Sequence, residues 1–348
     1  MTSNIFEQLP DLLLPWYEQN KRNLPWRKTR EPYHVWLSEI MLQQTRVEAV
    51  KGYYTRFLEA LPSIDRLASC EDEQLYKLWE GLGYYSRVRN LKKAACQIME
   101  LHGGVFPDNY DDIRALAGIG DYTAGAISSI CFDMPRAAVD GNVLRVVSRL
   151  TENDTPIDLP QRKREVTAAL EAVYPAQAGA FTQALMELGA TLCGPNWAPK
   201  CEICPCREIC AAALHGTALQ YPVKLPKKEK REERKTVFIL CCDGRFALQK
   251  RPDTGLLAGL WQFPNVEGHL DTEKALQKLE QLGIHPREII KQVERRHIFT
   301  HIIWKMRGIY LEVAQETEGY HWLTAEEIQD EAALPTAFRQ FFEEADHV

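Results

Sequence analysis

The sequence has no long hydrophobic run, no secretory leader and little net charge. A membrane-spanning helix needs about 18 or more consecutive apolar residues, and no stretch of the 348 residues approaches that length. The opening residues, MTSNIFEQLPDLL, lack the order of basic, apolar and small residues that marks a signal peptide. We therefore expect a cytoplasmic protein that makes no use of a membrane.

The small net charge of −6 also disfavours one class of function. Proteins that coat nucleic acid nonspecifically are strongly basic, although a local basic face is compatible with an acidic total. Hydrophobic residues make up 45% of the chain and charged residues 26%, as in ordinary globular domains. A chain of this length exceeds one ordinary hydrophobic core, which predicts two domains.

Disulfide bonds are not expected in a cytoplasmic chain, so the ten cysteines need another explanation. Cys193, Cys201, Cys204 and Cys210 all lie within the eighteen residues CGPNWAPKCEICPCREIC. Four clustered thiolates predict a metal centre, and zinc and a [4Fe-4S] cluster both accept four sulfur ligands. The spacing alone does not choose between them, and Cys206 is a fifth thiol in the same loop.

The residue pattern changes once along the chain. Residues 1–220 have helical periodicity almost throughout, including the stretches 33–54 and 161–190. Residues 221–235 are charged, contain proline and predict a linker. In residues 236–348, two strand-like runs flank the hairpin-forming pair Asp243-Gly244, and helical stretches follow. We expect an all-α domain, a linker and an α+β domain.

Residues 116–142 have the composition of a motif that binds a nucleic-acid backbone. Gly118 and Gly120 form a turn before a helix of small residues, and at such a turn backbone N–H groups can approach a phosphate closely. Asp140 follows the helix and could be held beside the sugar attached to that phosphate. A simple core contact between two helices explains the same glycines, so this motif does not decide by itself.

A second acid, Glu39, lies in the most apolar part of the stretch 33–54. Most helix glutamates are solvated and have no chemical role. If the side chain is buried, desolvation raises its pKa and makes it a proton donor near neutral pH. Upstream, Trp26 and Arg27 suit either a contact with nucleic acid or closure of the core.

A glycine loop with aromatic residues, WEGLGYY over 79–85, precedes a basic stretch. Arg87, Arg89, Lys92 and Lys93 follow the loop with no acid among them. A loop and helix of this kind suit a wedge into the minor groove with phosphate contacts, and suit an ordinary helix hairpin equally well.

In this order, the motifs SEIMLQQTRV, GLGYYSRVRNL, LAGIGDYTAGAI, AVDGNVLRV and the four-cysteine loop resemble the adenine DNA glycosylases of the MutY family. These are helix–hairpin–helix enzymes related to endonuclease III. The resemblance covers nearly the whole chain. It implies one [4Fe-4S] cluster rather than zinc, and a Nudix-like second domain. It also implies a substrate of double-stranded DNA with adenine opposite 8-oxoguanine or guanine. We expect the protein to act as a monomer.

The resemblance assigns roles by position. Glu39 matches the family's catalytic acid, and Asp140 matches the superfamily's aspartate, which Tyr122 and Asn142 would support. The cysteines at 193, 201, 204 and 210 match the cluster ligands. Positions that match contacts with DNA or with the two bases are Trp26, Arg27, Gln44, Thr45, Leu82, Tyr84, Gly118, Gly120, Gln183, Phe299, Thr300 and His301.

Two places depart from the family pattern. Phe299-Thr300-His301 stands where the family has a Phe-Ser-His loop that reads 8-oxoguanine, so the hydroxyl is kept but a methyl group is added. The first cysteine gap holds seven residues, whereas the family usually has six. We keep the same four ligands, because a surface bulge can absorb one residue.

We expect base removal without strand cleavage. Glu39 would protonate N7 of a flipped adenine, and Asp140 would stabilise the oxocarbenium-like sugar. In bifunctional relatives that resemble endonuclease III, a lysine after the hairpin glycines attacks the sugar. Here Tyr122 follows Gly120-Asp121, and no lysine lies between residues 101 and 159.

Three other interpretations stay open. A bifunctional glycosylase-lyase fits the helical part but lacks the lysine. A DNA-binding module would leave Glu39 and Asp140 without a role. A Nudix pyrophosphatase needs several glutamates on one helix to hold Mg²⁺. The stretch VEGHLDTEKALQKLEQLG lacks the Arg-Glu and paired-glutamate core of such a helix, so we expect the second domain to recognise its target without cleaving it.

Overall fold

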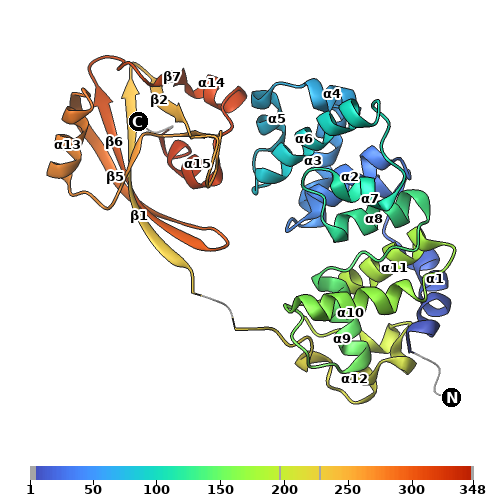
Figure 1. The fold of residues 1–348 in the computed structure, drawn as a ribbon. Helices are drawn as coiled ribbons and strands as arrows, with labels where there is room; N and C mark the ends of the chain where they lie inside the picture. Colours follow the sequence, from blue (N-terminus) through green and yellow to red (C-terminus); the bar gives the residue numbers. More distant parts are fainter. Residues whose placement is uncertain (1–4, 196, 227–228, 346–348) are drawn as a thin grey trace. The chain divides into compact units, whose positions relative to one another are not determined.

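The computed structural model describes residues 5–195, 197–226 and 229–345. A helical part comes first and a part built on a β-sheet follows, which confirms the expected fold class (Figure 1). No helix among these residues is both long and apolar enough to cross a membrane.

The chain divides into two compact units, Met1–Ser69 with Arg89–Pro226 and Cys70–Val88 with Lys227–Val348. This division differs from the expected boundaries, because α5 (Asp72–Trp79) joins the second unit. Contacts distant in sequence hold it there: the Glu80 carboxylate accepts a hydrogen bond from the backbone N–H of Leu334 at 2.9 Å.

The first unit is a bundle of helices connected by short turns. Its buried core includes Leu13 of α1, Val147 of α9 and Phe181 of α11, all with no exposed surface. The helices are α1 (Leu9–Asn20), α2 (Pro32–Leu42), α3 (Val47–Ala60), α4 (Ile64–Ser69), the larger part of α6 (Ser86–Leu101), α7 (Tyr110–Ala115), α8 (Asp121–Phe132), α9 (Gly141–Thr151), α10 (Pro160–Glu171), α11 (Ala178–Thr191) and α12 (Ala211–Leu214).

Two stretches expected to be continuous helix are each divided. The stretch 33–54 breaks between α2 and α3, where Gln44 adopts a left-handed backbone with φ of 58°. The stretch 161–190 breaks between α10 and α11 around Pro175. Proline disfavours helical geometry in the residue before it and lacks an N–H donor, so it ends the first helix.

The second unit is organised around a mixed sheet with the strand order β3-β2-β1-β6-β5. The central pair β1 and β6 is parallel, and the other pairs are antiparallel, with β4 added to β1 and β7 to β2. The strands are β1 (Arg231–Cys242), β2 (Arg245–Lys250), β3 (Trp261–Gln262), β4 (Asn265–Glu267), β5 (Pro286–Ile298), β6 (Ile302–Val313) and β7 (His321–Thr324).

The turn between β1 and β2 confirms the hairpin predicted from Asp243-Gly244, since both residues have positive φ, 47° and 78°. Strand β1 begins at Arg231, inside the stretch 221–235 that we predicted as a linker. All five residues from 231 to 235 are charged, yet they form a strand that pairs with β6, and a continuous charged run has no alternation that would reveal a strand.

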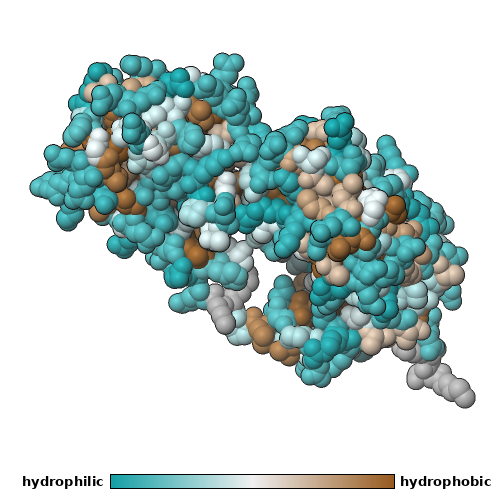
Figure 2. All heavy atoms as spheres, turned by 45° about the horizontal axis from the view of Figure 1, so that its top comes forward, coloured by the Kyte–Doolittle hydropathy of each residue, from teal (hydrophilic) through white to brown (hydrophobic). Residues whose placement is uncertain are grey.

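Helices cover both faces of the sheet (Figure 1). On one face, Trp304 and Met306 pack against Phe338 and Phe341 of α15 (Thr336–Phe342), with α14 (Ala325–Asp330) beside them. On the other face, Ile309 and Leu311 pack under α13 (Thr272–Gln281). Figure 2 shows a largely hydrophilic surface on which hydrophobic residues form small separate groups, as expected when the apolar residues fill these cores.

Candidate active site

Glu39 lies on α2 in the apolar interior of the first unit, and only 6% of the residue is exposed. Its Oε2 accepts a hydrogen bond of 2.9 Å from the Tyr122 hydroxyl of α8. Burial raises the pKa of the Glu39 carboxyl to about 7, with a further rise from Asp140, while the Tyr122 hydrogen bond and Arg27 lower it. Near neutral pH, a large fraction of Glu39 is therefore protonated and able to donate a proton.

Asp140 caps the N-terminus of α9. Its carboxylate accepts hydrogen bonds from the backbone N–H groups of Asn142 and Val143, both at 2.9 Å, and from the Asn142 side-chain amide at 2.7 Å. These three donors fix the orientation of the carboxylate at the positive end of the helix dipole. We expected Tyr122 to support Asp140, but its hydroxyl donates to Glu39 instead.

A chain of hydrogen bonds continues from Asp140 to the cysteine loop. Arg145 on α9 donates to Asn142 Oδ1 at 3.0 Å and to the carbonyl of Cys193 at 2.8 Å. One turn further, Arg149 lies 3.2 Å from Cys193 Sγ and donates to the Gly194 carbonyl at 3.1 Å. Helix α9 thus has Asp140 at its N-terminus and, through Arg149, contacts the thiol of Cys193.

The cysteine loop fits a four-sulfur cofactor in its donor chemistry. The four predicted ligands lie at the start or end of short 3-10 turns over 201–209 or beside α9. Burial, and then the charges of the other three thiols, raise the pKa of Cys210. A buried guanidinium beside a thiol, as Arg149 is, suits a thiolate ligand. Among the residues that the structure describes, no three Cys, His, Asp or Glu side chains are grouped to hold a metal ion as they stand.

Cys206 is distinct from these four, because it is buried in the core of the first unit with 1% exposed. A hydrogen bond with Cys204, together with burial, raises the pKa of its thiol. Its position against apolar residues is that of a packing cysteine.

The hairpin glycines differ in how strictly the backbone requires them. Gly118 has φ of 76°, and a Cβ atom there would lie 2.6 Å from Asn90 Cβ, so only glycine fits. Gly120 caps the N-terminus of α8 with φ of −96°, and nothing lies within 4 Å of a Cβ built on it. Gly120 is exposed at the start of α8, and a helix N-terminus is a place where backbone N–H groups can bind an anion.

Two residues expected to wedge into DNA, Gln44 and Tyr84, have left-handed backbones with φ of 58° and 47°. This conformation costs free energy in residues other than glycine, and both side chains are exposed. Thr45 beside Gln44 is half-buried. Leu82, by contrast, is buried with 7% exposed. In this structure its side chain is therefore not exposed for the contact with DNA that we expected.

The place of Arg87 in the basic stretch indicated a phosphate ligand on the surface, but the structure places this residue in the interior. It is buried, and its guanidinium donates to the carbonyls of Leu82 and Gly83, both at 3.0 Å. It also lies over the Trp79 ring. Burial lowers its pKa to about 10. Arg87 therefore holds the shape of the glycine loop.

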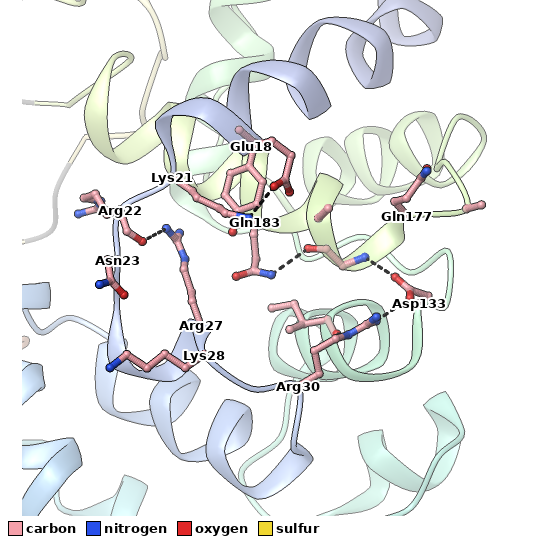
Figure 3. A pocket seen from close by; sticks show the side chains of 15 residues that line it. Glu18, Lys21, Arg22, Asn23, Arg27, Lys28, Arg30, Asp133, Gln177 and Gln183 are labelled. Atoms are coloured by element: carbon pink, nitrogen blue, oxygen red, sulfur yellow. Dashed lines mark hydrogen bonds and ion pairs between the residues drawn. The ribbon is translucent and has the colours of Figure 1, made fainter.

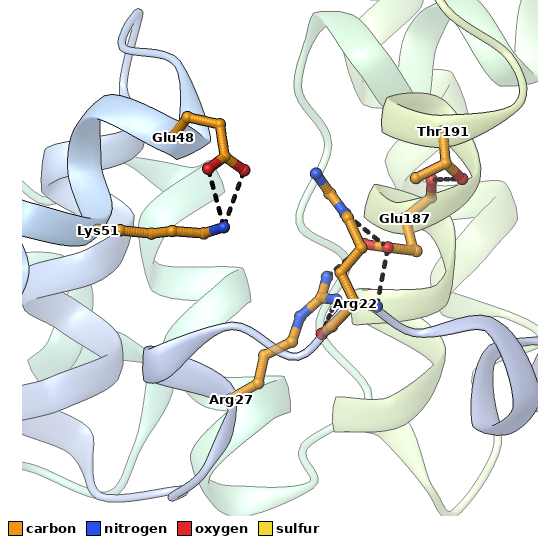
Figure 4. A network of polar contacts seen from close by, with 6 residues as sticks. All are labelled: Arg22, Arg27, Glu48, Lys51, Glu187 and Thr191. Atoms are coloured by element: carbon orange, nitrogen blue, oxygen red, sulfur yellow. Dashed lines mark hydrogen bonds and ion pairs between the residues drawn. The ribbon is translucent and has the colours of Figure 1, made fainter.

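A polar network that the sequence did not reveal centres on Glu187 of α11, whose side chain has no exposed surface (Figure 4). Arg22 Nε and Arg27 Nη2 each approach its carboxylate to 2.7 Å. Burial raises the Glu187 pKa, but the hydrogen bonds from both arginines outweigh burial and lower it. The only sequence signal was a lone acid in the apolar run LMELGA, the same signal that marked Glu39.

Arg22, Arg27 and Gln183 line an open pocket of about 610 Å³ in the first unit, together with residues of α1, α8 and α11 (Figure 3). The Gln183 amide donates to the Gly179 carbonyl at 3.3 Å. Trp26 is buried rather than exposed, and packs edge-on against Tyr54 with ring centres 5.5 Å apart. Arg27 is the member of the Trp26-Arg27 pair that reaches this pocket.

In the second unit, Phe299, Thr300 and His301 form the turn between β5 and β6. Phe299 packs against Trp304 with ring centres 4.8 Å apart, whereas Thr300 and His301 are exposed. The Thr300 hydroxyl makes a hydrogen bond of 2.9 Å with the hydroxyl of Tyr84, which belongs to the same unit. Two predicted lesion contacts are thus adjacent.

Comparison with known proteins agrees with this geometry. Residues 37–175 match the HhH-GPD superfamily of base excision DNA repair proteins, and residues 236–344 match the NUDIX domain. The chain is 35% identical to the adenine DNA glycosylase of Rattus norvegicus over 95% of this chain and 76% of that protein. With the human adenine DNA glycosylase it shares 35% identity over 95% of this chain and 72% of that one.

The chain belongs to the adenine DNA glycosylase family. A solved structure of a thermostable thymine-DNA glycosylase matches it with a TM-score of 0.55 and 27% identity, covering 61% of this chain and 97% of that one. A non-covalent endonuclease III–DNA complex matches with a TM-score of 0.51 and 21% identity, covering 61% and 97%, and shows the shared fold. The protein is a base-excision DNA glycosylase with a helical HhH-GPD domain and a Nudix-like α+β domain.

Proposed function

We propose that this adenine DNA glycosylase hydrolyses the N-glycosidic bond of adenine opposite 8-oxoguanine or guanine in duplex DNA. The observation that carries the proposal is the pairing of two acids in different environments. Glu39 is buried with a pKa of about 7, while Asp140 is held by three N–H donors at a helix start. Separated carboxyl environments of this kind suit an acid and a charge-stabilising partner.

The adenine must first leave the base stack and enter the protein, at a cost of a few kcal/mol. Gln44, exposed on a strained backbone, would fill the space that the base vacates. Tyr84, which is also exposed on a strained backbone, is proposed to contact the duplex. Arg27 and Gln183 are proposed to line the approach to the flipped base, and Glu187 holds Arg27 in position. Trp26 supports this wall from the core.

Glu39 then donates its proton to N7 of adenine, and the C1′–N9 bond breaks with its electron pair moving to the base. Asp140 stabilises the oxocarbenium-like cation at C1′, where it can also form a transient covalent adduct. Water adds to C1′ and loses a proton, which leaves an abasic sugar and free adenine. Asn142 holds Asp140, and Tyr122 holds Glu39, for this sequence.

Tyr122 is also the reason to propose a monofunctional enzyme. A lyase needs an amine that attacks the sugar to form a Schiff base. The Tyr122 phenol cannot do so, and its pKa is raised far above the usual value by burial and by the neighbouring Glu39 and Asp140. A bifunctional glycosylase-lyase is therefore the less supported alternative.

We infer that Cys193, Cys201, Cys204 and Cys210 hold one [4Fe-4S] cluster. When bound, the cluster would tie the loop together by iron–thiolate bonds. Arg149 and Arg145 contact Cys193 and would then anchor the loop against α9. Brown colour and absorption near 400 nm in the purified protein would support this assignment, and a colourless zinc-loaded protein would refute it.

We further propose that the Nudix-like domain recognises 8-oxoguanine through Phe299, Thr300 and His301, without pyrophosphatase activity. Thr300 offers a hydroxyl beside that of Tyr84, and both side chains are exposed. The protein is proposed to act as a monomer in the cytoplasm.

A strand-cleavage assay tests the proposed function. A labelled duplex with adenine opposite 8-oxoguanine is incubated with excess protein, and one half of each time point is heated with alkali. We expect strand breaks only after alkali treatment. Breaks without alkali would show lyase chemistry, and the absence of breaks in both halves would refute the glycosylase proposal.

A further inference from the structure

A row of three basic side chains crosses the sheet of the second unit near the β5–β6 turn. Lys305 on β6 is paired in register with Arg296 on β5 and with Arg234 on β1. Side chains of paired residues point to the same face, and neighbouring strands are about 4.8 Å apart. The three cations therefore stand abreast, over about 10 Å in all.

This row lies on the sheet face that α13 covers further along the strands. Ile309, four residues beyond Lys305 on β6, is buried under that helix. At the row itself the face is open, because Arg234 and Arg296 are exposed and the Lys305 side chain is 40% exposed. Ile298, in the next row toward the turn, is 53% exposed. The His269 ring lies against the backbone of the row, with its Nε2 2.9 Å from the Lys305 carbonyl oxygen.

The charges of the row are only partly balanced. Like charges directly opposite each other on a sheet are destabilising, and Glu232 alone offsets them, with its Oε2 2.6 Å from Lys305 Nζ. The Glu232 pKa is lowered by that hydrogen bond first, and then by the charges of Lys305, Arg296 and Arg234. One carboxylate thus faces three cations. The side chains of Arg234 and Arg296 have no hydrogen-bond or ion-pair partner within the described part of the chain.

The next row along, away from the turn, does not change this balance. Arg307 on β6 is paired in register with Glu294 on β5, and Arg307 also donates to the Leu270 carbonyl at 2.9 Å. Arg307 therefore has an acid opposite it in register, whereas Arg234, Lys305 and Arg296 stand opposite one another.

The position of the row relates it to the turn that is proposed to read the lesion. Arg296 lies four residues before Thr300 on the same hairpin, which corresponds to about 13 Å along a strand. Lys230 binds the Phe299 carbonyl at 2.8 Å and adds another positive charge at the turn. A nucleotide held at the turn would place its neighbouring phosphates within reach of the row.

We propose that Arg234, Lys305 and Arg296 bind the phosphate backbone of the DNA strand that carries 8-oxoguanine. Successive phosphates of one strand rise about 3.4 Å along the DNA axis. They lie farther apart in space because the backbone winds around that axis, so the row reaches about two of them. Glu232 occupies the site as an internal counter-ion and is displaced from Lys305 when a phosphate arrives. The inference rests on the proposed function, since it assigns part of the substrate to this surface.

The test is the salt dependence of DNA binding by the full-length, cluster-loaded protein. The probe is a duplex with 8-oxoguanine opposite a 2′-fluoro adenosine, which blocks cleavage of the glycosidic bond. Each phosphate contact adds about 0.9 to the slope of log affinity against log salt concentration. We expect R234A/R296A to reduce the slope by about 1.8. The control pair K274A/R287A, with the same charge change on exposed residues of the same unit, should leave the slope unchanged.

Glu232→Gln provides a measurement with the opposite sign. Removing the internal counter-ion should tighten binding at low salt, by about tenfold if one ion-pair competition is lost. An unchanged slope in R234A/R296A, an equal loss in the control pair, or weaker or unchanged binding by Glu232→Gln would each overturn the inference. Adenine excision by the wild-type protein is measured in parallel: its absence would refute the proposed function, whereas excision with an unchanged slope refutes only the phosphate row.

Discussion

At the scale of single residues, the central feature is that Glu39 combines deep burial with one strong hydrogen bond. Its Tyr122 partner favours the carboxylate, yet burial dominates and raises the pKa from 4.5 to about 7. A carboxylic acid that is still protonated near neutral pH is what protonation of a leaving base requires. The same residue should therefore set both the pH dependence of the reaction and part of the pH dependence of stability.

We predict that the single-turnover rate of adenine release falls as the pH rises through about 7, because the required form of Glu39 is the protonated acid. Well above this pH the decline should approach tenfold for each unit of pH. The measurement is the excision rate at saturating enzyme across a pH series. A rate that stays flat between about pH 6 and pH 9 would contradict the assignment of Glu39 as the acid.

Glu39 should also affect stability, with a definite sign. Because its pKa is higher in the folded protein than the ordinary value of 4.5, it contributes stability below that pH and loses the contribution as the pH rises to about 7. Glu39→Gln should therefore be more stable than the wild type at pH 8 by up to about 3 kcal/mol, relative to their difference at pH 4. Urea unfolding of both proteins at the two pH values checks this, and equal differences would contradict it.

At the scale of structural elements, α9 depends on Asp140 as its N-terminal cap. Loss of such a cap costs about 1 kcal/mol, whereas asparagine caps nearly as well as aspartate. We predict that Asp140→Ala lowers the free energy of unfolding by about 1 kcal/mol, and that Asp140→Asn changes it by less than about 0.5 kcal/mol. Chemical denaturation of the wild type, Asp140→Ala and Asp140→Asn measures these differences in the free energy of unfolding. Equal loss in both variants would mean that the helix does not use this cap.

The contact between α11 and the segment before α2 depends on Glu187, which holds Arg22 and Arg27. Breaking a buried pair leaves uncompensated charge. We predict that Glu187→Gln lowers the free energy of unfolding by about 3 kcal/mol. This is the low end of the range for a buried ion pair, because Arg22 is partly exposed. The surface pair Glu48–Lys51, also drawn in Figure 4, is the matched control. Glu48→Gln should cost at most about 0.5 kcal/mol, and equal losses on denaturation would contradict the role of Glu187.

At the scale of the whole molecule, the sequence predicted what depends on local pattern. The apolar neighbours of Glu39 left both burial and solvation of this acid open, and the fold decides for burial. The pair Asp243-Gly244 predicted a hairpin, and both residues have positive φ. The order of an all-α part and an α+β part followed from the change in periodicity.

Contacts between distant residues were not predictable in the same way. Glu187 looked like any lone helix acid until the fold brought Arg22 and Arg27 to it. Arg87 looked like a phosphate ligand, but the loop carbonyls that it binds turn it inward. The basic row of β1, β5 and β6 exists only through strand register, which joins residues far apart in the chain.

The central claim is that Glu39 and Asp140 carry out adenine excision, and one measurement tests it most directly. Release of free adenine from a duplex with 8-oxoguanine is followed under single-turnover conditions for the wild type, Glu39→Gln and Asp140→Asn, with binding to an uncleavable duplex measured for each. We expect both variants to bind within a few-fold of the wild type and to lose at least about a hundredfold in rate, the lower range for general acid catalysis. Adenine release at the wild-type rate by either variant would contradict the claim.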